Sequence, residues 1–370
     1  MRTRVTELFG IEYPIFAFSH CRDVVAAVSR AGGMGVLGAL YFTPEELELE
    51  LKWIDEHVGG KPYGVDVVMP AKYEGADLGD AQELMSKLQS MIPEEHRRFV
   101  DELLAEHGVE PLSEEGAGRY LLGWTDATAR PQVEVALAHP IALLANALGP
   151  PPADVVEQAH ERGVIVAGLA SNARHARKQV AVGVDIIVAQ GTEAGGHTGD
   201  VSTMVLIPEV VDAVGEETIV LAAGGIGRGR QIAAGLALGA EGVWTGSIWL
   251  TVDEADTPQA ARGKLLNATS RDTVRSRSWT GKPARLLKTA WTDAWESEKS
   301  PGTLPMPMQF MLISDALRRI GRSGDGELTT FPVGQIVGSM NQVRPAAQVV
   351  YDLIEEYVEA IERLNTITDA

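Results

Sequence analysis

Short apolar runs rich in valine and isoleucine alternate along the chain with stretches of helical periodicity. One helical stretch follows Ser171 and Asn172 and ends at Gly183, and these residue types favour the start and the end of a helix. Strands that alternate with helices are typical of a parallel sheet. The eight apolar runs cover residues 13–18, 35–40, 63–69, 141–148, 164–169, 185–190, 218–223 and 241–249.

Eight strand and helix units predict an α/β protein, and the count fits a closed (β/α)8 TIM barrel. An open sheet with helices on both faces is the alternative that the same pattern allows. In a barrel, the active site lies at the carboxyl ends of the strands, so the residues that follow each run become the candidates for chemistry.

The chain is longer than a barrel needs. A barrel takes about 250 residues, whereas this chain has 370. We expect residues 1–250 and 331–370 to form the barrel, with a helical insertion at about 71–130. Residues 251–330 are mostly helical in pattern, and we expect them to form a smaller region that covers the substrate. Beyond Pro345 the apolar spacing predicts an outer helix that packs through Val350, Ile354, Tyr357, Ile361 and Leu364.

Charge and composition narrow the possible partners. The 51 acidic and 32 basic residues give a net charge of −19, which repels nucleic acids and anionic membranes. No apolar stretch reaches the roughly 18 residues that span a bilayer. The start of the chain has no secretory pattern, and the single cysteine, Cys21, permits no internal disulfide. We therefore expect a cytoplasmic protein with a small-molecule substrate, which could also form a homo-oligomer.

Glycine pairs follow the seventh and eighth predicted strands. Gly224 and Gly225 let the backbone approach an anion closely, and the next helix would add its first N–H groups and its positive dipole end. Gly246 and Ser247 supply further donors. The alternative is that these glycines only turn the chain. Because loops after strands seven and eight commonly bind phosphate in barrels, we expect a phosphate here, with Trp244 and Thr245 beside the same ligand.

The loop after the sixth strand places one histidine among glycines. Gln190 ends the strand with an amide that could bind a heteroaromatic ring, and Gly195 and Gly196 would leave space for a flat ligand. With an ordinary pKa near 6.5, His197 would suit removal of a proton or pairing with an anion. The alternative is a histidine whose hydrogen bonds are satisfied by nearby backbone.

Several segments resemble the nitronate monooxygenases, formerly called 2-nitropropane dioxygenases, which are FMN-dependent barrel enzymes. The segment DIIVAQGTEAGGHTG resembles the central motif of that family. The other segments follow in family order: EYPIFAF, AVSRAGGMGVLGA, LAAGGIGRGRQIAAGLALGAEGVWTGS, SRDTVRSRSWTGKPARLLK and FPVGQIVGSM. Only the helical segment at about 71–130 lies outside the resemblance.

The resemblance implies that the ligand is FMN. Its phosphate would bind at Gly225, Gly246 and Ser247, and Gln190 and Gly195 would lie near its ring system. The backbone of Phe18, Ser19 and His20 would lie beside the flavin.

The resemblance also implies the reaction. A nitronate would reduce the flavin, and O2 would complete its conversion to a carbonyl compound and nitrite. His197 matches the active-site histidine of the family, which would hold the nitro group or remove the α-proton of a neutral nitroalkane. The protein would supply orientation and electrostatics.

Two positions differ from the family pattern. Phe18, Ser19 and His20 stand where an Ala-Pro-Met turn is usual, and Asp66 replaces an asparagine. A second imidazole at the edge of the flavin is expected to alter substrate choice. An ionised carboxylate would disfavour a negatively charged reduced flavin unless it is protonated or paired.

Two other functions remain open on the sequence. The first is an FMN-dependent NAD(P)H reductase of enoyl thioesters or quinones, and the second is a flavin-binding protein without turnover. Metal catalysis is not expected, because the eight histidines are scattered and no set of metal ligands is apparent. A serine hydrolase is not expected either, since the G-x-S-x-G motif does not occur.

Overall fold

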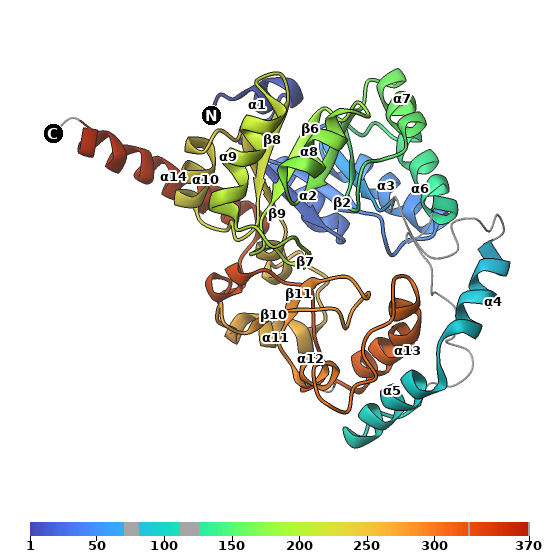
Figure 1. The fold of residues 1–370 in the computed structure, drawn as a ribbon. Coiled ribbons are helices and arrows are strands. Elements are labelled where there is room, and N and C mark those ends of the chain that lie inside the picture. Colours follow the sequence, from blue (N-terminus) through green and yellow to red (C-terminus); the bar gives the residue numbers. More distant parts are fainter. Residues whose placement is uncertain (70–80, 112–125, 325, 369–370) are drawn as a thin grey trace.

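Eight parallel strands close into a barrel that forms the upper part of the molecule in Figure 1. The computed structural model describes residues 1–69, 81–111, 126–324 and 326–368, and for residues 81–85, 126–128 and 368 it describes only the backbone. The TIM barrel prediction is confirmed, with a strand in each of the eight predicted runs. The strands are β1 (Ile15–Ser19), β2 (Met34–Gly38), β3 (Tyr63–Val67), β4 (Leu143–Asn146), β5 (Ile165–Ala170), β6 (Ile186–Gln190), β8 (Ile219–Ala223) and β9 (Gly242–Thr245).

The barrel closes where β1 pairs with β9, with Ile15 opposite Val243 and Ala17 opposite Thr245. The last predicted strand is shorter than expected, because the chain leaves the sheet at Gly246 and forms the 3-10 helix η2 (Ser247–Thr251). Closure brings the carboxyl ends of all eight strands to one mouth.

Alternate side chains of each strand point into the barrel, because side chains along a strand alternate between its two faces. Both faces are buried, by the barrel interior on one side and by helices on the other, which explains why these strands are continuous apolar runs. The interior cluster is Phe16, Met34, Val36, Leu143, Ala145, Ala167, Ile186, Val188, Leu221, Ala223 and Trp244. Four more residues face inward nearer the carboxyl ends of their strands. They are Phe18 of β1, Gly38 of β2, Asp66 of β3 and Gln190 of β6.

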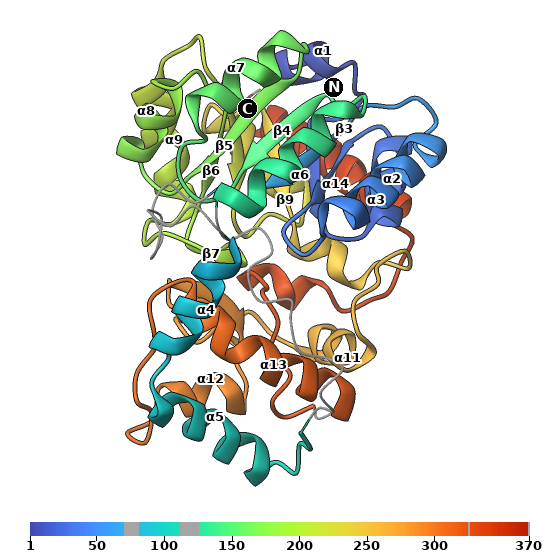
Figure 2. The same cartoon turned by 90° about the vertical axis from the view of Figure 1, so that its right-hand side faces the viewer.

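A ring of helices surrounds the strands (Figures 1 and 2). Local signals set several of their ends. Thr43 and Glu46 form a capping box at the start of α3, Asn172 accepts a hydrogen bond from the His175 N–H at the start of α8, and Gly183 turns the chain with φ of +93°. The helices are α1 (Arg4–Phe9), α2 (Arg22–Arg30), α3 (Pro44–His57), α6 (Asp126–Ala138), α7 (Ala153–Glu161), α8 (Ala173–Val180), α9 (Thr203–Val214), α10 (Gly229–Ala237) and α14 (Ala346–Thr368).

The C-terminal helix α14 packs on the barrel through its first half, and its far end extends away from the barrel (Figure 1). Val350 is fully buried, as predicted. Leu364 was expected to pack as well, but it is 46% exposed, because α14 is longer than the surface beneath it.

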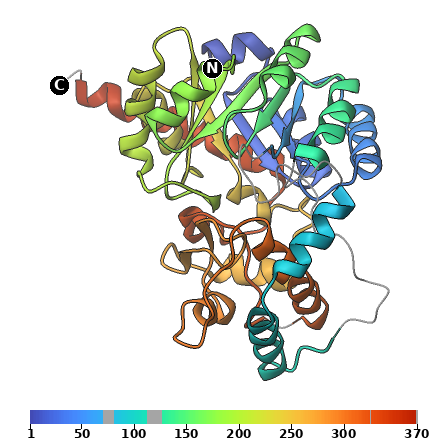
Figure 3. The same ribbon diagram turned by 45° about the vertical axis from the view of Figure 1, so that its right-hand side comes forward.

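A second group of elements lies below the barrel mouth (Figures 1 and 3). Residues 251–330 contribute three helices and two strands. The strands pair with a two-residue strand that carries His197, in the order β10, β11, β7, a sheet that the sequence pattern did not indicate. The elements of this group are α4 (Ala81–Met91), α5 (Glu94–Glu106), β7 (Gly196–His197), α11 (Gln259–Asn267), β10 (Thr273–Ser276), β11 (Ala284–Leu287), α12 (Ala290–Trp295), α13 (Met308–Ser323) and the 3-10 helix η3 (Gln335–Ser339).

Helices α4 and α5 lie within the predicted insertion and pack against α13. Leu88, Leu103 and Leu104 join Trp291 and Ile313 in one apolar cluster separate from the barrel core. Within the described residues, none of the helices combines the length and the apolar character needed to cross a membrane.

His139 forms an ionic cluster on the outside of the barrel. Its Nδ1 lies 2.6 Å from an Asp55 oxygen and its Nε2 lies 3.0 Å from a Glu48 oxygen, while the Tyr63 hydroxyl donates to Asp55 at 2.6 Å. Burial lowers the pKa of His139, but the hydrogen bonds and the negative charges of Asp55 and Glu48 outweigh this and raise it overall.

We predict that this cluster stabilises the fold more at low pH than at high pH. Because the folded pKa of His139 is raised, its contribution is fully present below the unfolded pKa of about 6.5 and is lost as pH rises through the folded value. His139→Gln should therefore reduce the free energy of unfolding more at pH 6 than at pH 9, by roughly 1 kcal/mol or less, because half-exposed Glu48 is screened by solvent. Urea unfolding at both pH values measures this, and equal losses would contradict it.

Candidate active site

The carboxyl ends of the barrel strands open into a cavity of about 550 Å³. Small-molecule sites commonly have volumes of 300 to 1,000 Å³, roughly. The last inward-facing residues of the strands line its base, among them Asp66, Leu169, Gln190 and Trp244. Helix α13 and the segment around Phe331 supply lining residues from the group below the barrel (Figure 3).

Every predicted site residue lines this cavity. They come from the ends of five strands, so closure of the barrel brings together positions that are far apart in the chain. The residues are Phe18, Ser19, His20, Asp66, Gln190, Gly195, Gly196, His197, Gly224, Gly225, Trp244, Thr245, Gly246 and Ser247.

Aromatic rings form one wall, where Phe18 stacks on Trp244 with ring centroids 6.4 Å apart. Next to this wall, Thr245 donates its hydroxyl hydrogen to the Phe16 carbonyl oxygen at 2.9 Å and accepts from Trp249 Nε1 at 3.0 Å. The Thr245 hydroxyl therefore ties β9 to β1, although the residue lies where the sequence analysis expected ligand contact.

The turn after β8 requires its two glycines. Gly224 has φ of +103° and Gly225 has φ of +69°, the left-handed region that favours glycine. A Cβ atom on Gly224 would also lie 2.7 Å from Thr203 Oγ1. Opposite this turn, Ser247 Oγ accepts from the Gly334 N–H at 2.9 Å, which leaves the hydroxyl hydrogen to donate to a ligand.

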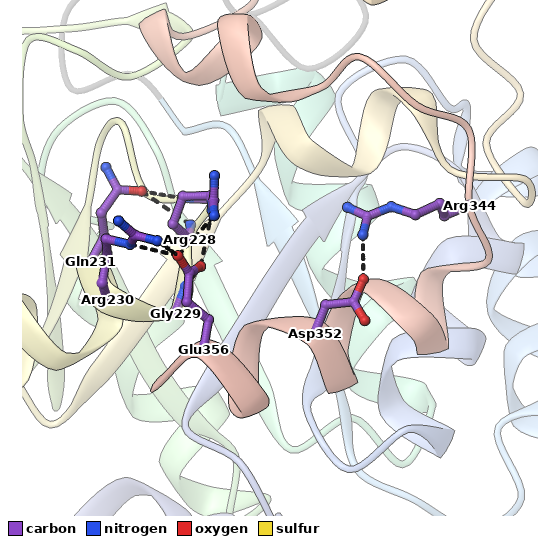
Figure 4. Close-up of polar contacts among 8 residues, drawn as sticks. Arg228, Gly229, Arg230, Gln231, Arg344, Asp352 and Glu356 are labelled. Atoms are coloured by element: carbon purple, nitrogen blue, oxygen red, sulfur yellow. Dashed lines mark hydrogen bonds and ion pairs between the residues drawn. The ribbon is translucent and has the colours of Figure 1, made fainter. Parts of the chain in front are cut away.

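The start of α10 differs from the prediction. The N–H groups at this end were expected to face a phosphate, but protein side chains already accept from the first N–H group of the helix and from the two N–H groups just before it (Figure 4). Gln231 Oε1 accepts from the N–H groups of Gly227 and Arg228 at 2.9 and 3.0 Å, and Glu356 accepts from the Gly229 N–H at 2.8 Å. The part of this site left for an anion is therefore the pair of turns at 224–225 and 246–247.

The glycines around His197 were expected to leave space for a flat ligand, but the structure shows that they also meet backbone requirements of their own. A Cβ atom on Gly195 would lie 2.8 Å from the backbone of Val333 and Gly334, so this position lets two loops approach closely. Gly196 needs a φ of +72°. His197 then pairs in register with Ala284 of β11, and its Nε2 lies 2.7 Å from Thr280 Oγ1. A neighbouring sheet and a hydroxyl thus fix the imidazole over the cavity.

The charge of His197 also differs from the prediction. Burial, and then the positive charge of Lys282, lower its pKa to about 4. The expectation of an ordinary pKa near 6.5 is therefore wrong for the ligand-free site. At neutral pH the imidazole is uncharged, so it can accept a proton or share a hydrogen bond but is not itself a counter-ion for an anion.

His20 and Asp66 lie together on the side of the cavity formed by β1, β2 and β3. His20 Nδ1 donates to the Gly38 carbonyl oxygen at 2.9 Å, and burial lowers the pKa of the ring. Gly38 is needed here, because a Cβ atom on it would lie 2.7 Å from the His20 ring. Asp66 is in register with Gly38, so both positions face the same side of the sheet.

Asp66 is 3% exposed. Burial raises its pKa to about 7. It can therefore be carried in the neutral form near neutral pH, which removes the conflict that a permanent negative charge beside a reduced flavin would create.

The sequence analysis missed the residues that reach the cavity from outside the barrel. Helix α13 contributes Phe310, Ser314, Leu317 and Arg318, and Trp279 lies between β10 and β11. The signal available was the helical spacing of the α13 residues, but nothing in that spacing tells which face of the helix meets the barrel mouth.

Comparisons with known proteins agree with this architecture. A family model described as nitronate monooxygenase matches residues 2–356. A provisionally named monooxygenase of Mycobacterium tuberculosis is 57% identical and covers 99% of this chain and 99% of its own. A protein of Staphylococcus aureus named as a probable nitronate monooxygenase is 30% identical, over 96% of this chain and 97% of its own. The solved structure of a nitroalkane oxidase from Streptomyces ansochromogenes is similar with a TM-score of 0.81 and 28% identity, over 97% of this chain and 99% of that chain.

We predict that His197 stays uncharged in the ligand-free protein down to about pH 5.5, well below the ordinary histidine pKa. NMR spectra of protein labelled at histidine Cε1, with His197→Gln for assignment, measure its titration. Lys282→Gln should raise the pKa, because it removes a positive charge close to the ring. A His197 titration midpoint near 6.5 in the unsubstituted protein would contradict the prediction.

Proposed function

Because this chain belongs to the nitronate monooxygenase family of flavin-dependent oxidoreductases, we propose that it uses FMN and O2 to oxidise alkyl nitronates to carbonyl compounds and nitrite. The observation that carries the proposal is the convergence of every predicted site residue on one cavity at the barrel mouth. Nitroalkanes are further candidate substrates if His197 removes their α-proton.

The residues present fit an FMN molecule. The turns at Gly224–Gly225 and Gly246–Ser247 would hold the phosphate through backbone N–H groups and one hydroxyl. Gln190 and Asp66 offer polar atoms to the ring system, and Phe18 and Trp244 offer apolar faces. Bound FMN would supply the electron transfer, while the protein binds and orients the reactants.

His197 would act on the substrate as a neutral imidazole. Thr280 holds the ring at Nε2 and the pairing of β7 with β11 holds its backbone, so the orientation is set before substrate arrives. A neutral ring can accept the α-proton of a nitroalkane or share a hydrogen bond with a nitro group. Its lowered pKa keeps the ring unprotonated at neutral pH but also makes it a weaker base than an ordinary imidazole.

An anionic substrate also needs a positive charge, because the chain carries a net charge of −19. Among the described residues that line the cavity, Arg318 of α13 is the cation, since His20 and His197 both have lowered pKa values. Arg318 also forms an ion pair with Asp315 one turn earlier. We assign Arg318 to attraction of the nitronate, and His20 and Asp66 to substrate choice.

We predict that the purified protein is yellow and that anaerobic addition of an alkyl nitronate bleaches its FMN absorbance. Admission of O2 should restore the spectrum and release nitrite. If NADH or NADPH reduces the flavin while the nitronate does not, the reductase function takes the place of this proposal. A colourless protein that fails to bind FMN on reconstitution would remove both.

His197→Ala should retain FMN but lose nitronate turnover by about 100-fold or more, the effect expected when a positioned base is lost. His160→Ala is the matched control, because His160 lies on the outside of the barrel and pairs with Asp185 at 2.9 Å. Steady-state oxygen consumption measures both variants. Equal turnover in His197→Ala and the unsubstituted protein would contradict the assignment and favour a flavin-binding protein without this chemistry.

Arg318→Gln should raise KM for an anionic nitronate by about tenfold with little change in kcat, which corresponds to about 1.4 kcal/mol of lost charge pairing. KM for the neutral nitroalkane should hardly change, and Arg318→Lys should restore part of the loss. Arg322→Gln is the control, because Arg322 has the same charge on the same helix but is exposed. Equal effects on the anionic and neutral substrates would contradict this role.

A further inference from the structure

The C-terminal helix α14 crosses the start of α10 at very short range. Gly229, the first residue of α10, has no side chain, and a Cβ atom there would lie 2.1 Å from the Leu353 carbonyl oxygen and 2.3 Å from the Tyr357 backbone nitrogen. The backbones of the two helices therefore touch directly at Gly229, and this close contact fixes the position of one helix relative to the other.

Glu356 of α14 occupies the N-terminal end of α10 (Figure 4). Its carboxylate accepts from the Gly229 N–H at 2.8 Å and from the Nε and a terminal nitrogen of Arg228, both at 2.9 Å. Arg230 donates to the same carboxylate. The Glu356 side chain is only 14% exposed, so this is a largely enclosed carboxylate whose charge two arginines balance.

Gln231 links this cluster to the turn after β8. Its Nε2 donates to the Gly225 carbonyl oxygen at 2.6 Å, and its Oε1 accepts from the N–H groups of Gly227 and Arg228. Arg228 therefore bonds to Glu356 through its side chain and to Gln231 through its backbone. A continuous set of hydrogen bonds runs from α14 to the turn at Gly224–Gly225.

We propose that Glu356 is a positioning residue for binding of the FMN phosphate, acting through Arg228, Gln231 and Gly225 without contacting the cofactor. This inference rests on the proposed function, because it takes the turn at Gly224–Gly225 as part of the phosphate site. It makes the outer C-terminal helix a determinant of cofactor affinity, although α14 contributes no residue to the cavity lining.

The direction of the change in FMN affinity when Glu356 is removed distinguishes a positioning role of Glu356 from a purely electrostatic effect of its charge. A carboxylate near a phosphate opposes binding, so removal of Glu356 would strengthen FMN binding if only charge mattered, and it would also release Arg228 and Arg230. A loss of affinity can therefore come only from disorder of the turn or from a general loss of structure. Riboflavin, which has the same ring system without the phosphate, distinguishes these two causes.

The experiment measures the dissociation constants of FMN and riboflavin by flavin fluorescence on the full chain after removal of bound flavin. Glu356→Ala should weaken FMN binding by about tenfold, the factor for roughly one lost charge-assisted hydrogen bond. Its riboflavin affinity should change by less than about twofold, because no phosphate is involved. Asp352→Ala is the matched control, because Asp352 lies one turn earlier on α14 and bonds to Arg344 (Figure 4) and to Gln348. It should leave both constants unchanged.

Glu356→Gln keeps one oxygen that can accept from the Gly229 N–H, so its preference for FMN over riboflavin should lie between those of the unsubstituted protein and Glu356→Ala. If Glu356→Ala does not fold, this variant decides, and an unchanged preference overturns the inference. Equal losses of FMN and riboflavin in Glu356→Ala overturn it as well. If the unsubstituted protein binds both flavins equally, the turn at Gly224–Gly225 does not bind the phosphate and this inference is wrong, whereas the proposal that the cavity binds a flavin still stands. If it binds neither, the proposed function itself fails.

Discussion

Closure of the barrel between β1 and β9 is the constraint on which the rest of the site depends. The Thr245 hydroxyl bonds β9 to the Phe16 carbonyl oxygen, and Trp249 bonds to Thr245 in turn. Only a closed sheet brings the ends of β1, β3, β6, β8 and β9 around one mouth. Residues separated by more than two hundred positions, such as Phe18 and Trp244, can then stack on each other.

Burial of the side chains at that mouth sets its chemistry. Burial disfavours the charged form of any group, so it moves a base and an acid in opposite directions. It lowers the pKa of His197 to about 4 and raises that of Asp66 to about 7. Both groups are therefore available in neutral forms near neutral pH, which leaves Arg318 as the cavity cation for an anionic substrate among the described residues.

Elements outside the barrel complete the site in two ways. The sheet β7, β11 and β10 holds His197 through its backbone, and α13 brings apolar and charged side chains to the mouth. Helix α14 does not reach the cavity, yet it bonds to the start of α10 through Glu356. The strand ends therefore provide the functional groups, and the surrounding elements fix their positions.

The sequence by itself determined the eight strands and the residues at their ends, because buried strands leave local apolar patterns and a closed barrel places their ends at one mouth. It could not determine the charge of His197, which depends on Lys282, or the state of Asp66, since desolvation arises only when distant segments pack. It also could not show that Glu356 takes the first N–H group of α10, because Glu356 lies 127 positions from Gly229. Local periodicity determines elements, whereas burial and the partners of polar groups depend on contacts between distant parts of the chain.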